Sequence, residues 1–212
     1  MPDKRSIFIT AIILLFVPAA LAHQPEIVSN EMTVIKDPGI SRAFYGELAG
    51  RPQTFLIEST RDFDLYLNLL VPKSSNPKGR FSAKVFSLNN EHQTLIGRLD
   101  QNAVKWTEFY EPFAGDYYLK GPEFKKHVPA GTYMVFVFNK NDRGKYVLAV
   151  GEKEAWGVIS TVKSLIILPK LKAQFFNTSV FKLFIVYMGF FYWIGSIIFL
   201  GLVLLAIRSI KR

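Results

Sequence analysis

The feature that most constrains the fold is an alternation of apolar and polar residues with period two, repeated between positions 42 and 150. Successive side chains of a β-strand point to opposite faces, so this pattern predicts short, half-buried strands. The predicted strands are residues 42–48, 53–59, 63–71, 81–88, 94–99, 104–109, 132–138 and 145–150. Seven or eight such strands, separated by turn residues, predict an all-β antiparallel sandwich of the jelly-roll-like type.

The last two predicted strands are the clearest. Residues 132–138 and 145–150 are apolar on both faces, which predicts central positions in a sheet. The linker at 139–144 contains Asn, Asp and Gly, which tolerate positive φ angles, so we expect a β-hairpin here.

The N-terminus has the three parts of an export signal. Lys4 and Arg5 precede an apolar run, and Ala22 ends a small-x-small cleavage pattern before His23. We therefore predict a signal peptide at residues 1–22 and a mature chain that begins at His23; an uncleaved signal anchor is the alternative. Both place the following domain, residues 23–154, outside the cytoplasm.

The C-terminus predicts a membrane anchor. Residues 183–207 are uncharged and long enough for a transmembrane helix of about 20 residues. The flanking basic residues are Lys182, Arg208, Lys211 and Arg212. This pattern predicts a single-pass type I protein of the cell membrane, with a cytoplasmic basic tail at residues 208–212 and the lipid bilayer as a partner.

Between these segments, residues 155–182 change to helical periodicity. Ile159, Val162, Leu165 and Ile166 recur at helical spacing before Pro169. The pattern predicts an amphipathic juxtamembrane helix that lies on lipid headgroups. A linker helix packed on the sandwich is the alternative.

The net charge of +9 does not indicate nucleic-acid binding. Residues 23–157 hold 17 Lys or Arg and 16 Asp or Glu, so the predicted sandwich is nearly neutral. Most of the excess of basic over acidic residues lies at residues 163–212, beside the predicted anchor. Cysteine is absent, which excludes disulfides and thiolate metal sites.

Three short motifs suggest a family. Residues 62–67 (DFDLYL), 129–133 (PAGTY) and 144–148 (GKYVL) resemble strands of the bacterial pre-peptidase C-terminal β-sandwich. Gly131, Thr132 and Tyr133, with Phe136 and Phe138, are also similar to a strand of GOLD-domain cargo receptors. Either resemblance implies a binding or adaptor module and not an enzyme; the second implies a cargo or assembly adaptor.

Residues 106–127 are rich in aromatic side chains and are interrupted by glycine and proline, which predicts a long loop. Such loops often carry binding sites. The candidate binding residues are Trp106, Tyr110, Tyr117, Tyr118 and Phe124. The alternative is a loop that folds its aromatic side chains over the open end of the core.

Candidate metal ligands are weak. Asp62 and Asp64 could contribute to a Ca²⁺ site, but two carboxylates fall short of six to eight oxygen ligands. His23 at a mature N-terminus could bind copper, completed by His92 or His127. No catalytic motif or cofactor signature is present in the sequence. We therefore expect a non-catalytic binding or adaptor protein for a protein or surface polymer, with copper handling as the alternative.

Overall fold

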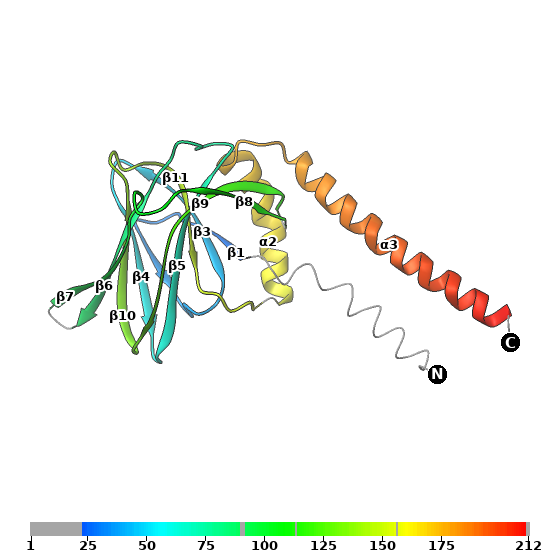
Figure 1. The fold of residues 1–212 in the computed structure, drawn as a ribbon, viewed down its shortest axis with the longest axis horizontal. Coiled ribbons are helices and arrows are strands. Elements are labelled where there is room, and N and C mark those ends of the chain that lie inside the picture. Colours follow the sequence, from blue (N-terminus) through cyan, green and yellow to red (C-terminus); the bar gives the residue numbers. More distant parts are fainter. Residues whose placement is uncertain (1–22, 90–91, 113, 156, 211–212) are drawn as a thin grey trace.

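The computed structural model describes residues 23–89, 92–112, 114–155 and 157–210. In this part of the chain, two stacked sheets form a β-sandwich (Figure 1). The strands are β1 (Gln24–Ile27), β2 (Met32–Ile35), β3 (Arg42–Ala49), β4 (Gln53–Ser59), β5 (Phe63–Pro72), β6 (Ser82–Asn89), β7 (His92–Leu99), β8 (Thr107–Glu111), β9 (Asp116–Val128), β10 (Gly131–Phe138) and β11 (Arg143–Val150).

One sheet has six strands in the order β1-β3-β11-β5-β9-β8, and the other has five in the order β2-β4-β10-β6-β7. Pairs β1–β3 and β2–β4 are parallel, whereas the other described strand pairs are antiparallel. The prediction of seven or eight antiparallel strands was wrong for the number of strands and for these two edges. β1 and β2 have four residues each, too few to show an alternating pattern.

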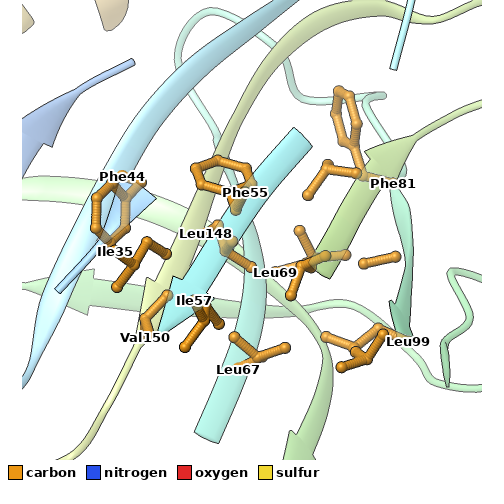
Figure 2. Packing of buried hydrophobic residues seen from close by; sticks show 14 of the residues in the cluster. Ile35, Phe44, Phe55, Ile57, Leu67, Leu69, Phe81, Leu99, Leu148 and Val150 are labelled. Atoms are coloured by element: carbon orange, nitrogen blue, oxygen red, sulfur yellow. The ribbon is translucent and has the colours of Figure 1, made fainter. Parts of the chain in front are cut away.

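The main core lies between the sheets. Figure 2 shows side chains from both sheets in this layer, including Phe55 and Ile57 of β4 and Leu148 and Val150 of β11. These four side chains are fully buried. A second cluster lies on the outer face of the six-stranded sheet, where Val147 and Ala149 of β11 are buried by a helical segment. Two packed faces explain why residues 146–150 are apolar on both sides of the strand.

The predicted hairpin between β10 and β11 is wrong, because the two strands belong to different sheets. Each lies in the interior of its own sheet, as the apolar character of both faces predicts. The linker still makes a tight turn, in which Asp142 has φ 48° and Gly144 has φ 106°. The turn therefore carries the chain from one sheet to the other, and the two strands that flank it do not pair with each other.

The predicted long loop at 106–127 is also wrong. It forms the β8–β9 hairpin, and β9 is the longest strand, with 13 residues. The register between β5 and β9 shifts between Asn68 and Leu70, opposite Gly121 and Pro122. Asn68 Nδ2 donates to the carbonyl oxygens of Gly121 (3.2 Å) and Pro122 (3.1 Å). The β-bulge and the hydrogen bonds from the buried Asn68 side-chain amide thus allow Pro122 to lie within a strand.

Helix α2 (Val158–Lys170) lies against β1 and continues into a π-helical segment, η2 (Leu171–Phe175) (Figure 1). Pro169 lies within the last turn of α2, and the helical chain continues past it as η2. Leu168 and Leu171 are buried against the outer face of the six-stranded sheet and the β8–β9 hairpin. One side of the segment 158–176 is therefore packed on the sandwich.

Helix α3 (Phe181–Ile210) extends away from the sandwich (Figure 1). A membrane-spanning helix needs about 20 consecutive apolar residues. Within the described residues, no helix sustains enough apolarity over enough length to cross a bilayer. The predicted transmembrane helix at 183–207 is corrected accordingly: the segment is helical, but the structure does not support its assignment as a span.

Candidate functional site

A cavity of about 180 Å³ lies on the outer face of the six-stranded sheet. Small and medium apolar side chains form its floor: Ala43 of β3, Leu70 of β5, and Val147 and Ala149 of β11. Leu168 of α2 and Phe109 of β8 also line it. Alanine at two floor positions leaves space that larger side chains would fill, so the sequence of β3 and β11 creates the hollow.

Polar groups from three directions line the same cavity. His23 precedes β1, Tyr66 and Asn68 come from β5, and Lys120 comes from β9. Lys120 Nζ lies 3.1 Å from Glu123 Oε2, and the Tyr66 hydroxyl donates to the same carboxylate oxygen at 3.5 Å. A linked set of hydrogen-bonding groups therefore accompanies a mostly apolar floor.

Burial shifts the pKa values of two of these groups, Tyr66 and His23. Burial, assisted by the Glu123 carboxylate, raises the pKa of Tyr66 to about 12, so its hydroxyl stays protonated at neutral pH. Burial and the Lys120 ammonium group lower the pKa of His23, which favours a neutral imidazole. The cavity thus presents neutral hydrogen-bonding groups beside the Lys120–Glu123 ion pair and the Glu111 side chain, whose Oε2 accepts a hydrogen bond from the Ala114 N–H at 2.8 Å. Such an arrangement suits binding by contact and hydrogen bonding.

Beside the cavity, a buried aromatic cluster joins the sheet to η2. The hydroxyls of Tyr45 and Tyr118 are hydrogen-bonded at 2.9 Å. Phe176 packs edge-on against both rings, with ring centroids 6.1 Å from Tyr45 and 5.5 Å from Tyr118. Burial raises the pKa of each tyrosine, so both hydroxyls stay protonated.

A buried ion pair lies in the same region. Lys172 Nζ of η2 is 2.7 Å from Asp116 Oδ1 of β9, and the two side chains are 1% and 6% exposed. Burial raises the pKa of Asp116, and the neighbouring Lys172 opposes that increase. The pair fixes the start of the β9 strand to the π-helical segment.

The tip of the β8–β9 hairpin carries exposed aromatic side chains. Tyr110 and Tyr117 are directly opposite in the register, with ring centroids 4.8 Å apart, and are 45% and 51% exposed. Lys73 Nζ lies 5.7 Å from the centroid of Tyr117 and forms an ion pair with Glu108. Exposed Phe109, on the neighbouring strand position, lines the cavity. Because successive side chains of a strand alternate, the Tyr110–Tyr117 pair projects from the side of the hairpin opposite to Phe109 and the cavity.

The five predicted binding residues separate into three groups. Tyr110 and Tyr117 are exposed, whereas Tyr118 is buried and lines the cavity. Trp106 and Phe124 are partly buried and pack against the main core. Trp106 Nε1 donates to the carbonyl of Gln101 at 3.0 Å, and Arg80 lies 5.1 Å from its ring centroid. These two side chains cover the core, as the alternative interpretation of this segment expected.

The weak metal candidates do not meet. Asp62 Oδ1 accepts a hydrogen bond from the Ala130 N–H (2.9 Å), and Asp64 Oδ1 lies 2.8 Å from His127 Nδ1. His23 lies at the cavity, while His92 begins β7 in the other sheet. Among the residues that the structure describes, no group of three or more His, Asp or Glu side chains could hold a metal ion.

The remaining predicted positions lie at the ends of the chain. Ala22, Lys211 and Arg212 fall outside the described residues. Lys182 and Arg208 are exposed on α3.

Sequence reasoning missed Tyr66, Asn68, Lys120 and the Asp116–Lys172 pair as parts of one region. Only Asn68, a polar residue between Leu67 and Leu69, gave a local signal. The others come together through the pairing of β5 with β9 and the docking of η2, which no local pattern reveals.

No family model matches the chain, and no curated protein matches it. Among solved structures, the pre-peptidase C-terminal domain of a collagenase from Bacillus anthracis is 11% identical, covers 58% of this chain and 96% of its own, and gives a TM-score of 0.37. CorA, a surface-associated copper-binding protein from Methylomicrobium album BG8, is 9% identical. The match covers 60% of this chain and 100% of CorA, with a TM-score of 0.30. The first belongs to the class that the sequence motifs resemble, but likenesses of this size support no argument about function.

Proposed function

We propose that the protein is a non-catalytic, extracytoplasmic binding module that recognises a protein partner at the β8–β9 hairpin and the adjacent cavity. The observation that carries this proposal is the β8–β9 hairpin itself: exposed Phe109 borders an apolar hollow on one side, and exposed Tyr110 and Tyr117 form a pair on the other side. Aromatic residues are enriched at protein interfaces, where they anchor in or around pockets.

The size and lining of the cavity favour a protein over a surface polymer. At about 180 Å³ it is smaller than the roughly 300–1,000 Å³ of most small-molecule sites. Its floor is apolar, which suits one aliphatic or aromatic side chain of a partner. A saccharide would need hydrogen-bonding groups, but Asn68 already donates to the carbonyls of residues 121 and 122, and Tyr66 and Lys120 both contact Glu123.

Photo-crosslinking in the native cells tests this proposal. A photoreactive phenylalanine analogue at Tyr110 or Tyr117 should give one discrete protein adduct. The same analogue at Leu95, an exposed apolar residue on β7 of the other sheet, is the matched control and should give none. Ala149→Val, which reduces the cavity without changing the hairpin surface, should weaken the adduct.

Two outcomes would contradict the proposal. Equal adducts from Tyr110 and Leu95 would show that the hairpin has no special role. Adducts that disappear after glycosidase treatment would identify a polymer as the ligand instead of a protein.

The extracytoplasmic location rests on the predicted signal at residues 1–22. N-terminal sequencing of the protein purified from its own cells should give His23 as the first residue. A chain that still begins at Met1 would contradict the predicted cleavage of the signal between residues 22 and 23.

Copper binding is a second candidate, because the lowered pKa of His23 favours the neutral imidazole that metals require. In this case the N-terminal amine and the imidazole of His23 would bind the ion. Titration with Cu²⁺, compared with His23→Ala, separates the candidates: saturable binding that the variant loses supports copper, and its absence in the wild type excludes it.

A further inference from the structure

Helix α2 has an apolar side that the sandwich leaves uncovered. Val162, Leu165 and Ile166 follow one another at helical spacing and are 50%, 49% and 63% exposed. We call these three residues the α2 outer face. On the packed side of the same helix, Leu168 is buried and Ile167 is partly buried against the sandwich. The helix therefore has two apolar sides, and packing within the described chain accounts for only one of them.

The exposed side is held in place by the packing of the rest of the helix. Lys163 Nζ lies 2.7 Å from Glu26 Oε1 of β1, and Leu168 packs with Ala114 and Leu183. The α2 outer face therefore cannot turn inward without breaking these contacts. Removal of apolar side chains from water is favourable, so a partner that covers all three would be stabilised by that burial.

Charge identifies the partner. From residue 155 to the C-terminus the sequence contains seven basic residues and no Asp or Glu. Two of the seven, Lys163 and Lys172, already pair with Glu26 and Asp116 and do not count toward the charge of this face. Lys170 and Lys182 are exposed near the end of α2 and the start of α3. A second copy of the chain would bring like charges together at this face. An apolar strip with lysines and no acidic side chains instead fits a bilayer that contains anionic lipid.

We propose that the α2 outer face docks into the headgroup region of a lipid bilayer that contains anionic lipid, with the axis of α2 along the membrane surface. The sandwich then rests beside the membrane through the packed side of α2. This contact is independent of the partner-binding proposal, because it uses a different surface.

The lack of cysteine makes a direct test possible. A single cysteine at Leu165 or Ile166 of the full-length protein carries an environment-sensitive fluorophore. With vesicles of phosphatidylcholine and phosphatidylglycerol, its emission should shift to the blue. A quencher in the upper acyl chains should remove roughly half of the signal or more, since the apolar side of an interfacial helix lies about 5–10 Å into the headgroup and acyl boundary.

Cysteines at Met32 on β2 and Leu95 on β7 are matched controls, because both positions are exposed and apolar but lie on the other sheet. Their labels should not respond to the quencher. Vesicles of phosphatidylcholine alone should give weaker quenching at residue 165.

Three outcomes would overturn the proposal. If the labels at 165 and 166 respond no more than the label at 32 while the protein is bound to vesicles, this face does not touch lipid. A blue shift that grows with protein concentration without lipid would indicate self-association. Equal quenching in neutral and anionic vesicles would remove the role assigned to charge.

Discussion

Asp116 and Lys172 place two opposite charges in the interior between β9 and η2. The Asp116 Oδ2 atom is buried and has no hydrogen-bond partner in the structure, so Lys172 supplies the main compensation for this carboxylate. Removing one partner of a buried pair leaves the other charge uncompensated, which is more costly than replacing both.

We therefore expect Lys172→Met to lower the free energy of unfolding at pH 7 by roughly 3–5 kcal/mol. Without the ammonium group, the pKa of Asp116 rises further, so the folded variant favours the protonated carboxyl. Its stability relative to wild type should therefore recover as the pH falls below this raised pKa. Urea denaturation at several pH values measures the effect.

The matched control is Lys73→Met, which breaks the exposed ion pair with Glu108. Exposed pairs contribute at most about 1 kcal/mol, so this variant should be nearly neutral. A Lys172→Met penalty as small as that of Lys73→Met, or one that does not change with pH, would contradict the assignment of a buried, compensating ion pair.

His23 gives a second prediction at the scale of a residue. Its pKa is lowered by burial first and by Lys120 second, so protonation opposes the folded state. Its contribution to stability is therefore present above the ordinary imidazole pKa of about 6.5 and is lost as the pH falls through the lowered value. NMR titration of the imidazole should show the lowered pKa, and Lys120→Gln should raise it towards the ordinary value.

His23→Gln should remove this part of the pH dependence of unfolding, since glutamine does not titrate. A His23 pKa at or above the ordinary value would contradict the burial of the imidazole in the cavity. Glu111 also lines the cavity, so Glu111→Gln tests whether a carboxylate offsets the effect of Lys120.

At the scale of the elements, the sequence predicted β3, β4, β5, β6, β10 and β11 closely, because each has the alternation of a strand with at least one buried side. β9 escaped prediction, since Gly121 and Pro122 interrupt it. These residues are tolerated only because the bulge opposite Asn68 accepts them. The cavity could not be predicted either, because it depends on which strands pair and on where α2 docks. Both depend on contacts between residues that are far apart in the sequence.

Gly121 also has a packing role in the β8–β9 hairpin. A Cβ atom at this position would lie 2.4 Å from the ring of Trp106, which covers the main core. Gly121→Ala should therefore displace the indole and destabilise the fold by roughly 1–3 kcal/mol. Denaturation measures the loss, and the NMR signal of the Trp106 indole N–H should shift.

Gly39→Ala is the control for this change, because a Cβ atom at Gly39 meets no atom within 4 Å. It should leave both the free energy of unfolding and the Trp106 signal nearly unchanged. If Gly121→Ala were equally silent, the close approach of Trp106 to β9 would not exist in solution.

At the scale of the whole molecule, the segment 158–176 is part of the sandwich and not a detached linker. Ser74 Oγ donates to the Phe176 carbonyl (2.7 Å), and Ser75 Oγ donates to the Phe175 carbonyl (2.6 Å). Phe176 itself is buried between Tyr45 and Tyr118. These contacts attach the end of the helical segment 158–176 to the β-sandwich.

The consequence is that α2, η2 and the six-stranded sheet should open together. Amide hydrogen exchange should therefore show residues 158–176 protected to a similar degree as β3 and β11, because one cooperative unit has one opening free energy. Phe176→Ala should cost roughly 3–5 kcal/mol and make 158–176 exchange faster than the sheet. Phe181→Ala, at a 76% exposed position, should change neither. If 158–176 exchanged rapidly in the wild type, the helical segment would be only loosely attached, and the orientation of the α2 outer face would no longer be fixed by the sandwich.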